Sequence, residues 1–362
     1  KSMMHRYHIS ISTLPNSDYT PREEDDRVGY FTTMYQDYSN TLEEDPYVRY
    51  INRWNLEKAF PHKKYSEPKE PIVFWLENTI PIEFRSAVEK GILGWNKAFE
   101  KIGYLNAIVV KQMPDNADWD PADARYNTIR WIVHPQSAYA VGPSRANPYT
   151  GELYDADIRI SNDYVRFYYE DFENFISPMM NQEKNNIWEE HDHDHDHDKH
   201  DSELCNYGEY LKHKMAFTWS YLVSNNMIIE NEKEMMKFIE DGIVDLLLHE
   251  VGHTLGLRHN FKASSVFSYE QLSDPEFTNE FGVTGSVMDY NGTNLLDGGT
   301  NYFQTQPGPY DYWAIEYGYS DKPFTSKLDD EQWLESIASR SLEPWLAYGT
   351  DEDAYSTTRS ID

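Results

Sequence analysis

The central part of the chain alternates short apolar runs with one long amphipathic segment. Residues 71–78 (PIVFWLEN) form a continuous apolar run, which predicts a buried strand. In residues 81–103 the apolar side chains recur every three or four positions, the spacing of a helix with one buried face. Gly103 suits the C-terminal cap of this helix, because glycine readily adopts positive φ. The apolar positions are Phe84, Val88, Ile92, Trp95, Phe99 and Ile102.

Further strand patterns follow this helix. Residues 106–112 (NAIVVKQ) and 127–134 (NTIRWIVH) predict two strands, and a last strand is expected near 156–160. A strand, a helix and three more strands predict a mixed sheet with one helix packed across it. The expected fold class is therefore α+β.

The second half of the chain is mainly helical in pattern. Residues 207–226 predict one helix, and 231–255 predict a longer one. The segment after His259 is rich in loop residues. Residues 309–319 predict a helix in which Asp311 is an N-terminal cap or a first-turn acid.

The first 68 residues look different from this core. Residues 7–11 alternate apolar and polar side chains and predict a strand, followed by a polar stretch expected to lie over a domain surface. Residues 61–71 are rich in proline and charge, which places a boundary near residue 68. We therefore expect residues 1–68 to be an extension or the end of an upstream domain, and 69–362 to be the main domain.

Within that domain, residues 162–206 look like an insertion. It contains the low-complexity tract 191–200 (HDHDHDHDKH), which allows two interpretations. The tract could capture metal ions, or it could be a solvated loop that binds them loosely. The second interpretation is favoured, because such a tract offers many ligands but no fixed geometry.

The charge balance narrows the possible partners. Lys and Arg total 32 against 62 Asp and Glu, so the formal net charge is −30. Such a chain would be repelled by nucleic acid and by anionic lipid. Aromatic residues make up 15% of the chain, which supplies material for a packed core and argues against disorder.

Other whole-chain features give weaker information. Cys205 is the only cysteine, so an intrachain disulfide and a cysteine-based zinc site are both excluded. No apolar run is long enough to predict a membrane span. The first residues, KSMMHRYHIS, lack the apolar region of a signal peptide and suggest a fragment of a longer chain.

The most informative stretch is residues 249–260, HEVGHTLGLRHN. On a helix, residues i and i+4 share one face, so His249 and His253 can bind one zinc ion. Glu250 lies about 100° around the helix axis, where it can act on a zinc-bound water. Gly256 allows the helix to end in a sharp turn, after which His259 can return to the metal. A helix with two histidines alone could be coincidence, but the added glycine and third histidine make a zinc site the preferred interpretation.

A second motif carries a resemblance to a known family. HEVGHTLGLRH followed by SVMDY resembles the signature of the metzincin zinc endopeptidases, with Met288 at the Met of their Met-turn. The element order of residues 71–160 and the helix expected around Asp311 are also similar to that domain. The likeness extends to a poorly characterised group of bacterial zinc-dependent metalloproteases, through residues 27–31, 256–264 and 284–291. Asn260 departs from the pattern, because many metzincins have Asp after the third histidine.

The resemblance implies roles for two more residues. Met288 would form an apolar floor beneath the metal, which is physically ordinary core packing. Tyr290 is similar in position to a tyrosine that binds zinc in some resting metzincins and later donates to the developing oxyanion. The alternative for Tyr290 is a buried tyrosine whose hydroxyl bonds the backbone. The resemblance also implies export from a bacterial cell.

The resulting hypothesis is a zinc-dependent endopeptidase that acts on protein or peptide substrates. His249, His253 and His259 would hold the zinc, and Glu250 would be the general base. An extended substrate would pair with an edge strand at residues 139–142, although this segment could equally be an ordinary sheet edge.

The loop 115–123 raises the question of calcium. It holds Asp115, Asp118, Asp120 and Asp123, and carboxylate oxygens suit calcium. The spacing matches no EF-hand, and a solvated acidic loop is the favoured alternative.

Three rival functions stay open from the sequence. The same zinc chemistry could hydrolyse a non-peptide acyl bond. The chain could instead be a binding module with structural zinc, although Glu250 argues against this. Finally, the N-terminal residues could cover the cleft and keep a protease latent. The sequence indicates neither the cleavage specificity nor the oligomeric state.

Overall fold

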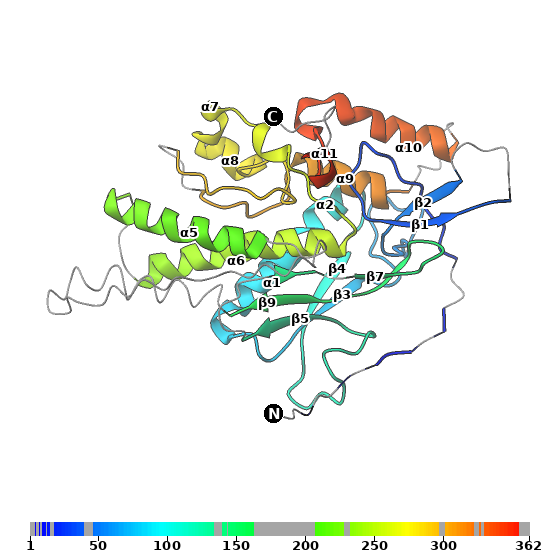
Figure 1. Ribbon diagram of the computed structural model, residues 1–362, viewed down its shortest axis with the longest axis horizontal. Coiled ribbons are helices and arrows are strands. Elements are labelled where there is room, and N and C mark those ends of the chain that lie inside the picture. Colours follow the sequence, from blue (N-terminus) through cyan, green and yellow to red (C-terminus); the bar gives the residue numbers. More distant parts are fainter. Residues whose placement is uncertain are drawn as a thin grey trace.

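The computed structural model describes residues 4, 7, 9–11, 13–14, 18–39, 46–133, 140–142, 144–162, 207–227, 232–296, 301–321, 326 and 329–354. Across these residues the protein has an α+β fold, with a central sheet, helices packed on it and a loop-rich C-terminal part (Figure 1). The fold class predicted from the sequence is confirmed. Most of the expected insertion, with Cys205 and the His-Asp tract, lies outside the described residues.

The central sheet is mixed, as predicted. β3 (Ile72–Leu76) pairs in parallel with β4 (Ile108–Gln112) and with β5 (Asn127–Ile132). β5 pairs in parallel with β9 (Ile158–Ser161), and β6 (Ala140–Val141) runs antiparallel to β9. The spatial order is β4-β3-β5-β9-β6, so β6 forms an edge of this sheet at the predicted place.

The strand expected near residues 156–160 is divided in two. β8 (Leu153–Ala156) pairs antiparallel with β7 (Ser144–Ala146) in a separate two-stranded sheet, and β9 begins after Asp157. The carboxylate of Asp157 is buried and accepts hydrogen bonds from the backbone N–H and the hydroxyl of Thr128, at 3.1 and 2.8 Å. This side chain marks the point where the chain leaves one sheet and enters the other.

The predicted helix at residues 81–103 forms as three consecutive pieces. They are the 3-10 turn η1 (Ile82–Phe84), α1 (Arg85–Gly94) and α2 (Asn96–Lys101). Trp95 at the junction is fully buried and donates its indole N–H to Leu248 O at 2.9 Å. Gly103 has φ +89°, which is the predicted glycine cap.

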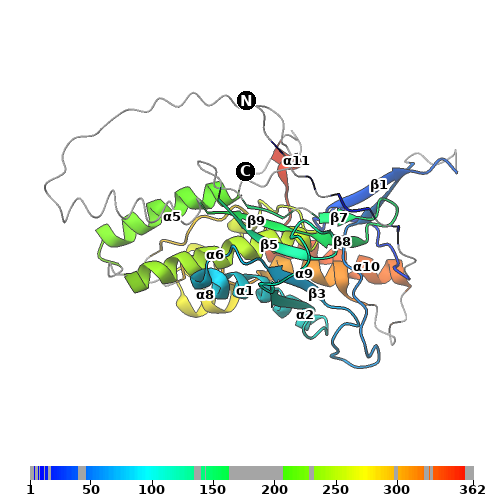
Figure 2. The same cartoon turned by 90° about the horizontal axis from the view of Figure 1, so that it is seen from below.

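The helix α1 packs closely against the long helix α6 (Glu232–Thr254). Gly91 allows this approach, because a Cβ there would lie 2.5 Å from Leu247 Cβ. α5 (Tyr207–Ser224) lies beside α6, as Figure 1 and Figure 2 both show. The helices predicted at residues 207–226 and 231–255 are therefore confirmed.

The chain after α6 contains short helices joined by loops, as the sequence predicts. α9 carries Asp311 in its first turn, as expected. The elements are η3 (Ala263–Ser265), α7 (Tyr269–Leu272), α8 (Pro275–Phe281), α9 (Pro309–Tyr319), α10 (Asp330–Ala338), η4 (Ser339–Leu342), η5 (Pro344–Leu346) and α11 (Asp351–Ala354).

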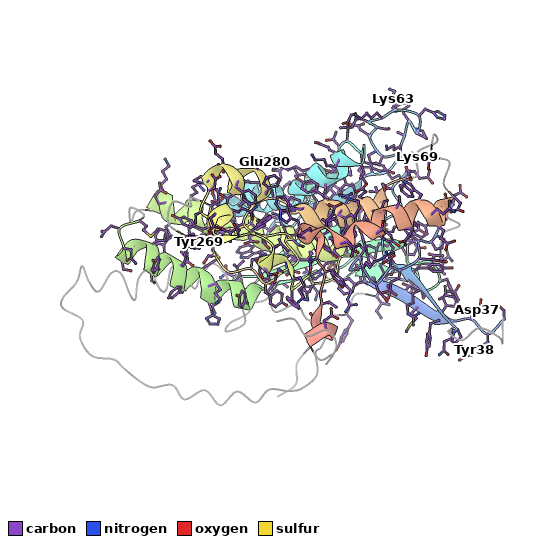
Figure 3. The ribbon with its side chains drawn as sticks, turned by 90° about the horizontal axis from the view of Figure 1, so that it is seen from above. Asp37, Tyr38, Lys63, Lys69, Tyr269 and Glu280 are labelled. Carbon is purple, nitrogen blue, oxygen red and sulfur yellow. The ribbon has the colours of Figure 1, made fainter. Side chains whose placement is uncertain are left out.

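The N-terminal region contributes a two-stranded ribbon. β1 (Thr32–Gln36) pairs antiparallel with β2 (Tyr47–Ile51), and Asp37 and Tyr38 lie at the outer end of this ribbon (Figure 3). The inner end is part of the main core, where four N-terminal side chains pack with those of the central sheet and helices. These side chains are Val28, Tyr30, Ile51 and Leu56. The domain boundary near residue 68 stays a prediction, but no separate core accompanies it among the described residues.

The strand predicted at residues 7–11 is wrong for the part of this segment that is described. Residues 7 and 9–11 belong to no strand, and Tyr7, Ile9 and Ile11 are exposed. Alternation alone does not stabilise a strand when no neighbouring strand or apolar surface is present. In the described part of the chain, no helix is both long and apolar enough to cross a membrane.

Candidate metal centre

The structure brings the three predicted histidines together at the end of α6. His249, His253 and His259 each offer a ligand atom, and these atoms all lie within 4.8 Å of one another. His253 Nε2 and His259 Nε2 are 3.2 Å apart. Within the described ranges, this histidine cluster is the only group of three or more His, Cys, Asp or Glu residues with metal-binding spacing.

Each histidine has an oxygen atom next to its Nδ1. The acceptor is a backbone carbonyl for two of them, which fixes Nδ1 as the donor and leaves Nε2 with a lone pair. Three imidazoles oriented in this way are a suitable donor set for zinc. The contacts are His249 Nδ1 to Val287 O at 2.7 Å, His253 Nδ1 to Leu257 O at 2.9 Å, and His259 Nδ1 to Asp351 Oδ1 at 3.5 Å.

The surroundings keep the imidazoles of His249 and His253 neutral. Burial and the neighbouring histidines lower the pKa of His249 well below its ordinary value. Burial, with a smaller effect of His259, lowers the pKa of His253 to about 3. At neutral pH both rings are therefore in the form that binds a cation. The hydrogen bond from His259 lowers the pKa of Asp351, so this carboxylate is ionised.

Gly256 makes the turn between the second and third histidines, as the sequence predicts. Its φ is +96°, in the left-handed region that other residues rarely adopt. A Cβ at this position would also lie 1.9 Å from the backbone oxygen of Asn52. Two independent constraints thus require glycine here, and the second comes from a segment that is distant in sequence.

The loop that carries the third histidine is held by the N-terminal region. The aromatic ring of Phe31 also lies beside the cluster, with its centroid 5.7 Å from that of His253. No sequence pattern indicates this arrangement, because the pairing depends on a long-range contact. The hydrogen bonds are Phe31 N to Gly256 O at 2.7 Å, Arg258 N to Gly29 O at 2.9 Å, and Trp54 Nε1 to Thr254 O at 2.8 Å.

Met288 lies where the resemblance places it, beneath the helix of the site. It is fully buried, and a Cβ on Gly252 would lie 2.2 Å from its sulfur atom. Gly252 directly precedes His253 in α6, so the Met288 side chain packs against the backbone next to the cluster. The neighbouring carbonyl of Val287 accepts the hydrogen bond from His249.

Glu250 and Tyr290 have different neighbours. Glu250 is fully buried, and a Cβ on Gly142, directly after β6, would lie 3.4 Å from Glu250 Oε2. The carboxylate therefore lies next to the edge strand. The Tyr290 ring centroid is 4.9 Å from that of His259 and 5.8 Å from that of His249.

Sequence reasoning missed Tyr207, the first residue of α5. Its ring stacks on that of His249 at 4.2 Å, and its hydroxyl donates to Asp245 at 3.1 Å. Asp245 is buried one helical turn before His249, and burial raises its pKa to about 7. The helical pattern of residues 207–226 indicated a helix but gave no sign of which side chain would meet the site.

The comparisons with known proteins agree with this geometry. A family described as Met-zincin matches residues 231–362, which include all three histidines, Glu250, Met288 and Tyr290. A family described as a domain of unknown function matches residues 1–59. No curated protein and no solved structure matches the chain. The Met-zincin match and the histidine cluster together support a metzincin-type fold and a zinc site.

The acidic loop at residues 115–123 shows no comparable cluster. Asp123 pairs with Arg125 at 2.6 Å, and Asp120 accepts the backbone N–H of Ala122 at 2.9 Å. Both carboxylates are thus engaged in local contacts. Calcium binding here stays a prediction without a supporting ligand cluster in the described part of the chain.

Proposed function

We propose that the chain is a zinc-dependent endopeptidase that hydrolyses peptide bonds. The observation that carries this proposal is the convergence of three buried or half-buried imidazoles. Two of their Nδ1 atoms donate to backbone carbonyls, and the third faces the Asp351 carboxylate at 3.5 Å. The Met-zincin match over the same residues supports a hydrolytic rather than a merely structural role for the zinc.

The residues around the cluster have the chemistry that peptide hydrolysis needs. A zinc ion bound there would supply Lewis acidity and lower the pKa of a coordinated water molecule. Glu250 would accept a proton from the attacking water and then transfer it to the leaving amine. Tyr290, whose ring borders His259, would donate its hydroxyl to the substrate carbonyl oxygen as negative charge develops there.

The edge strand β6 supplies the means to hold a peptide. Among the described strands β6 is hydrogen-bonded to β9 alone, and an extended substrate could pair with its other side. Gly142 follows β6 and lies against Glu250, so such a peptide would pass beside the proposed base. Main-chain pairing of this kind accepts many sequences, which suits a protein substrate. Export from the cell stays a prediction that rests on the resemblance.

The test is to measure zinc content and casein cleavage for the wild type and for Glu250→Gln. Glu280→Gln is the matched control, because Glu280 is an exposed carboxylate on α8 (Figure 3). We expect about one zinc per chain in all three proteins. Cleavage should be lost in Glu250→Gln, retained in Glu280→Gln, and abolished in the wild type by a chelator.

Other outcomes would separate the rival functions. Stoichiometric zinc without cleavage of casein, but with hydrolysis of small acyl substrates, would replace the peptidase with another zinc hydrolase. Equal cleavage by wild type and Glu250→Gln would remove Glu250 from the mechanism. Absence of stoichiometric zinc from the wild type would overturn the proposal.

A further inference from the structure

The three histidines of the cluster differ in how they are oriented. His249 and His253 donate to backbone carbonyls close to α6 or to the turn around Met288. His259 lies outside the helix, and its Nδ1 faces the carboxylate of Asp351 at 3.5 Å. The Nδ1 atom of the third histidine thus faces a side chain, whereas those of the first two face backbone carbonyls.

Asp351 reaches His259 because a preceding segment, residues 347–350, is fixed to the loop of the site. Phe261 donates its backbone N–H to Gly349 O at 2.7 Å. Asn260 Nδ2 donates to Ala347 O at 3.0 Å, and Asn260 Oδ1 accepts from Gly349 N at 3.2 Å. Residue 260 directly follows the third histidine, so the same loop carries His259 and holds the segment that leads to Asp351.

These contacts explain why residue 260 is Asn in this chain. The side chain is fully buried and uses both its donor and its acceptor on one segment. An aspartate could still accept from Gly349 but could not donate to Ala347. Its carboxylate would instead face the carbonyl oxygen of Ala347 in a buried place, which is unfavourable.

Residues 347–350 also pack against the N-terminal region and α9. The ring of Tyr348 covers Gly29, where a Cβ would lie 2.2 Å from a Tyr348 ring carbon, and it stacks on Tyr310 at 5.9 Å. Beyond it, Thr350 N donates to Asp353 Oδ2 at 2.9 Å, at the start of α11. Asp351 is the first residue of that helix and directly follows the packed segment.

We propose that Asp351 is a positioning residue for His259, and that Asn260 holds residues 347–350 so that Asp351 can act. This inference rests on the proposed zinc site. The carboxylate accepts the Nδ1 proton of His259 and orients Nε2 toward His249 and His253. A carboxylate behind a metal-binding histidine also strengthens it as a ligand, and loss of such a partner typically costs about 10–100-fold in metal affinity.

The test compares the zinc affinity of full-length variants by competition with a chromophoric chelator. Asp351→Ala removes charge and acceptor, whereas Asp351→Asn keeps an acceptor. We therefore expect zinc affinity to fall from wild type to Asp351→Asn and further to Asp351→Ala. The wild type should bind zinc about 10–100-fold more tightly than Asp351→Ala. Asp26→Asn, at an exposed turn, is the control and should keep wild-type affinity.

Asn260→Asp tests the second half of the proposal. It should weaken zinc binding as Asp351→Ala does, although the Asp351 carboxylate is still present. Combining Asn260→Asp with Asp351→Ala should give little further loss, because both act through the same contact. Thermal unfolding of the metal-free proteins shows whether a variant is folded, and Asp351→Ala provides a second route if Asn260→Asp is not.

The outcomes separate this inference from the proposed function. Wild-type affinity in Asp351→Ala would overturn the inference and leave the zinc peptidase intact. If the variants bind zinc more weakly but the wild type cleaves no peptide, the inference is supported and the peptidase function is rejected. A wild type that binds no zinc would overturn both.

Discussion

Asp311, in the first turn of α9, accepts the hydroxyl of Ser286 at 2.5 Å, and this contact fixes the turn that contains Met288. The same carboxylate accepts the backbone N–H of Val287 at 2.9 Å and of Gly308 at 2.7 Å. Val287 in turn provides the carbonyl that receives His249 Nδ1. A helix start distant from the cluster in sequence thus determines the position of a turn that orients the first histidine.

The first prediction concerns Asp311→Ala. The substitution leaves three buried donors without their acceptor, so we expect a loss of about 3 kcal/mol in the free energy of unfolding. Zinc binding should also weaken, because the turn that orients His249 becomes free to move. Urea unfolding and chelator competition measure the two effects. Asp330→Ala, in the exposed first turn of α10, should change neither, and equal behaviour of the two variants would contradict the prediction.

The second prediction concerns pH and Asp245. Burial raises the pKa of Asp245 from 3.8 to about 7, although Tyr207 and Gln304 donate hydrogen bonds to its carboxylate. Between these pH values the folded state retains a proton that the unfolded chain has lost. The free energy of unfolding should therefore fall as pH rises through this window, by up to about 1.4 kcal/mol per pH unit from this group.

Asp245→Asn tests this linkage, because an amide does not titrate and the Tyr207 hydroxyl can reverse its role from donor to acceptor. We expect the variant to lose less stability than the wild type between pH 4 and pH 8, so that it gains relative to the wild type with rising pH. Urea unfolding with a chelator present isolates the effect from zinc binding. Parallel curves for the two proteins would show that Asp245 titrates normally.

The third prediction concerns Gly256→Ala. The new Cβ would meet Asn52 O at 1.9 Å and the residue would have to keep φ +96°, so we expect destabilisation of at least about 2 kcal/mol and weak zinc binding. Gly292→Ala is the matched control, since a Cβ there would have no heavy atom within 4 Å and the backbone imposes no positive φ. Thermal unfolding and zinc content distinguish the two, and similar values would refute the proposed role of Gly256.

The fourth prediction concerns the N-terminal region. Trp54→Phe removes the indole N–H that bonds Thr254 O at the end of α6, and we expect a loss of about 1–3 kcal/mol in stability. Peptidase activity should fall as well, because Thr254 directly follows His253. Trp119→Phe, in the loop at residues 115–123, is the control and should leave activity unchanged. Full activity in Trp54→Phe would show that residues 52–54 do not support the site.

Much of the candidate site was predictable because it depends on local spacing. The i, i+4 positions of His249 and His253 place both side chains on one face of α6 in any context that keeps the helix. Gly256 and His259 follow within the next turn, and the apolar pattern of residues 81–103 marks the face that packs inward. These features involve residues a few positions apart, so sequence alone determines them.

The tertiary structure decided which distant residues complete the site. Asp351 behind His259, Asp311 beneath the Met288 turn, Tyr207 on His249 and Trp54 at the end of α6 are brought together by chain packing. No local periodicity records such contacts, because each depends on where an entire helix or segment is placed. The strand predicted at residues 7–11 is wrong for the same reason. Its local pattern suits a strand, but its described residues pair with no other strand.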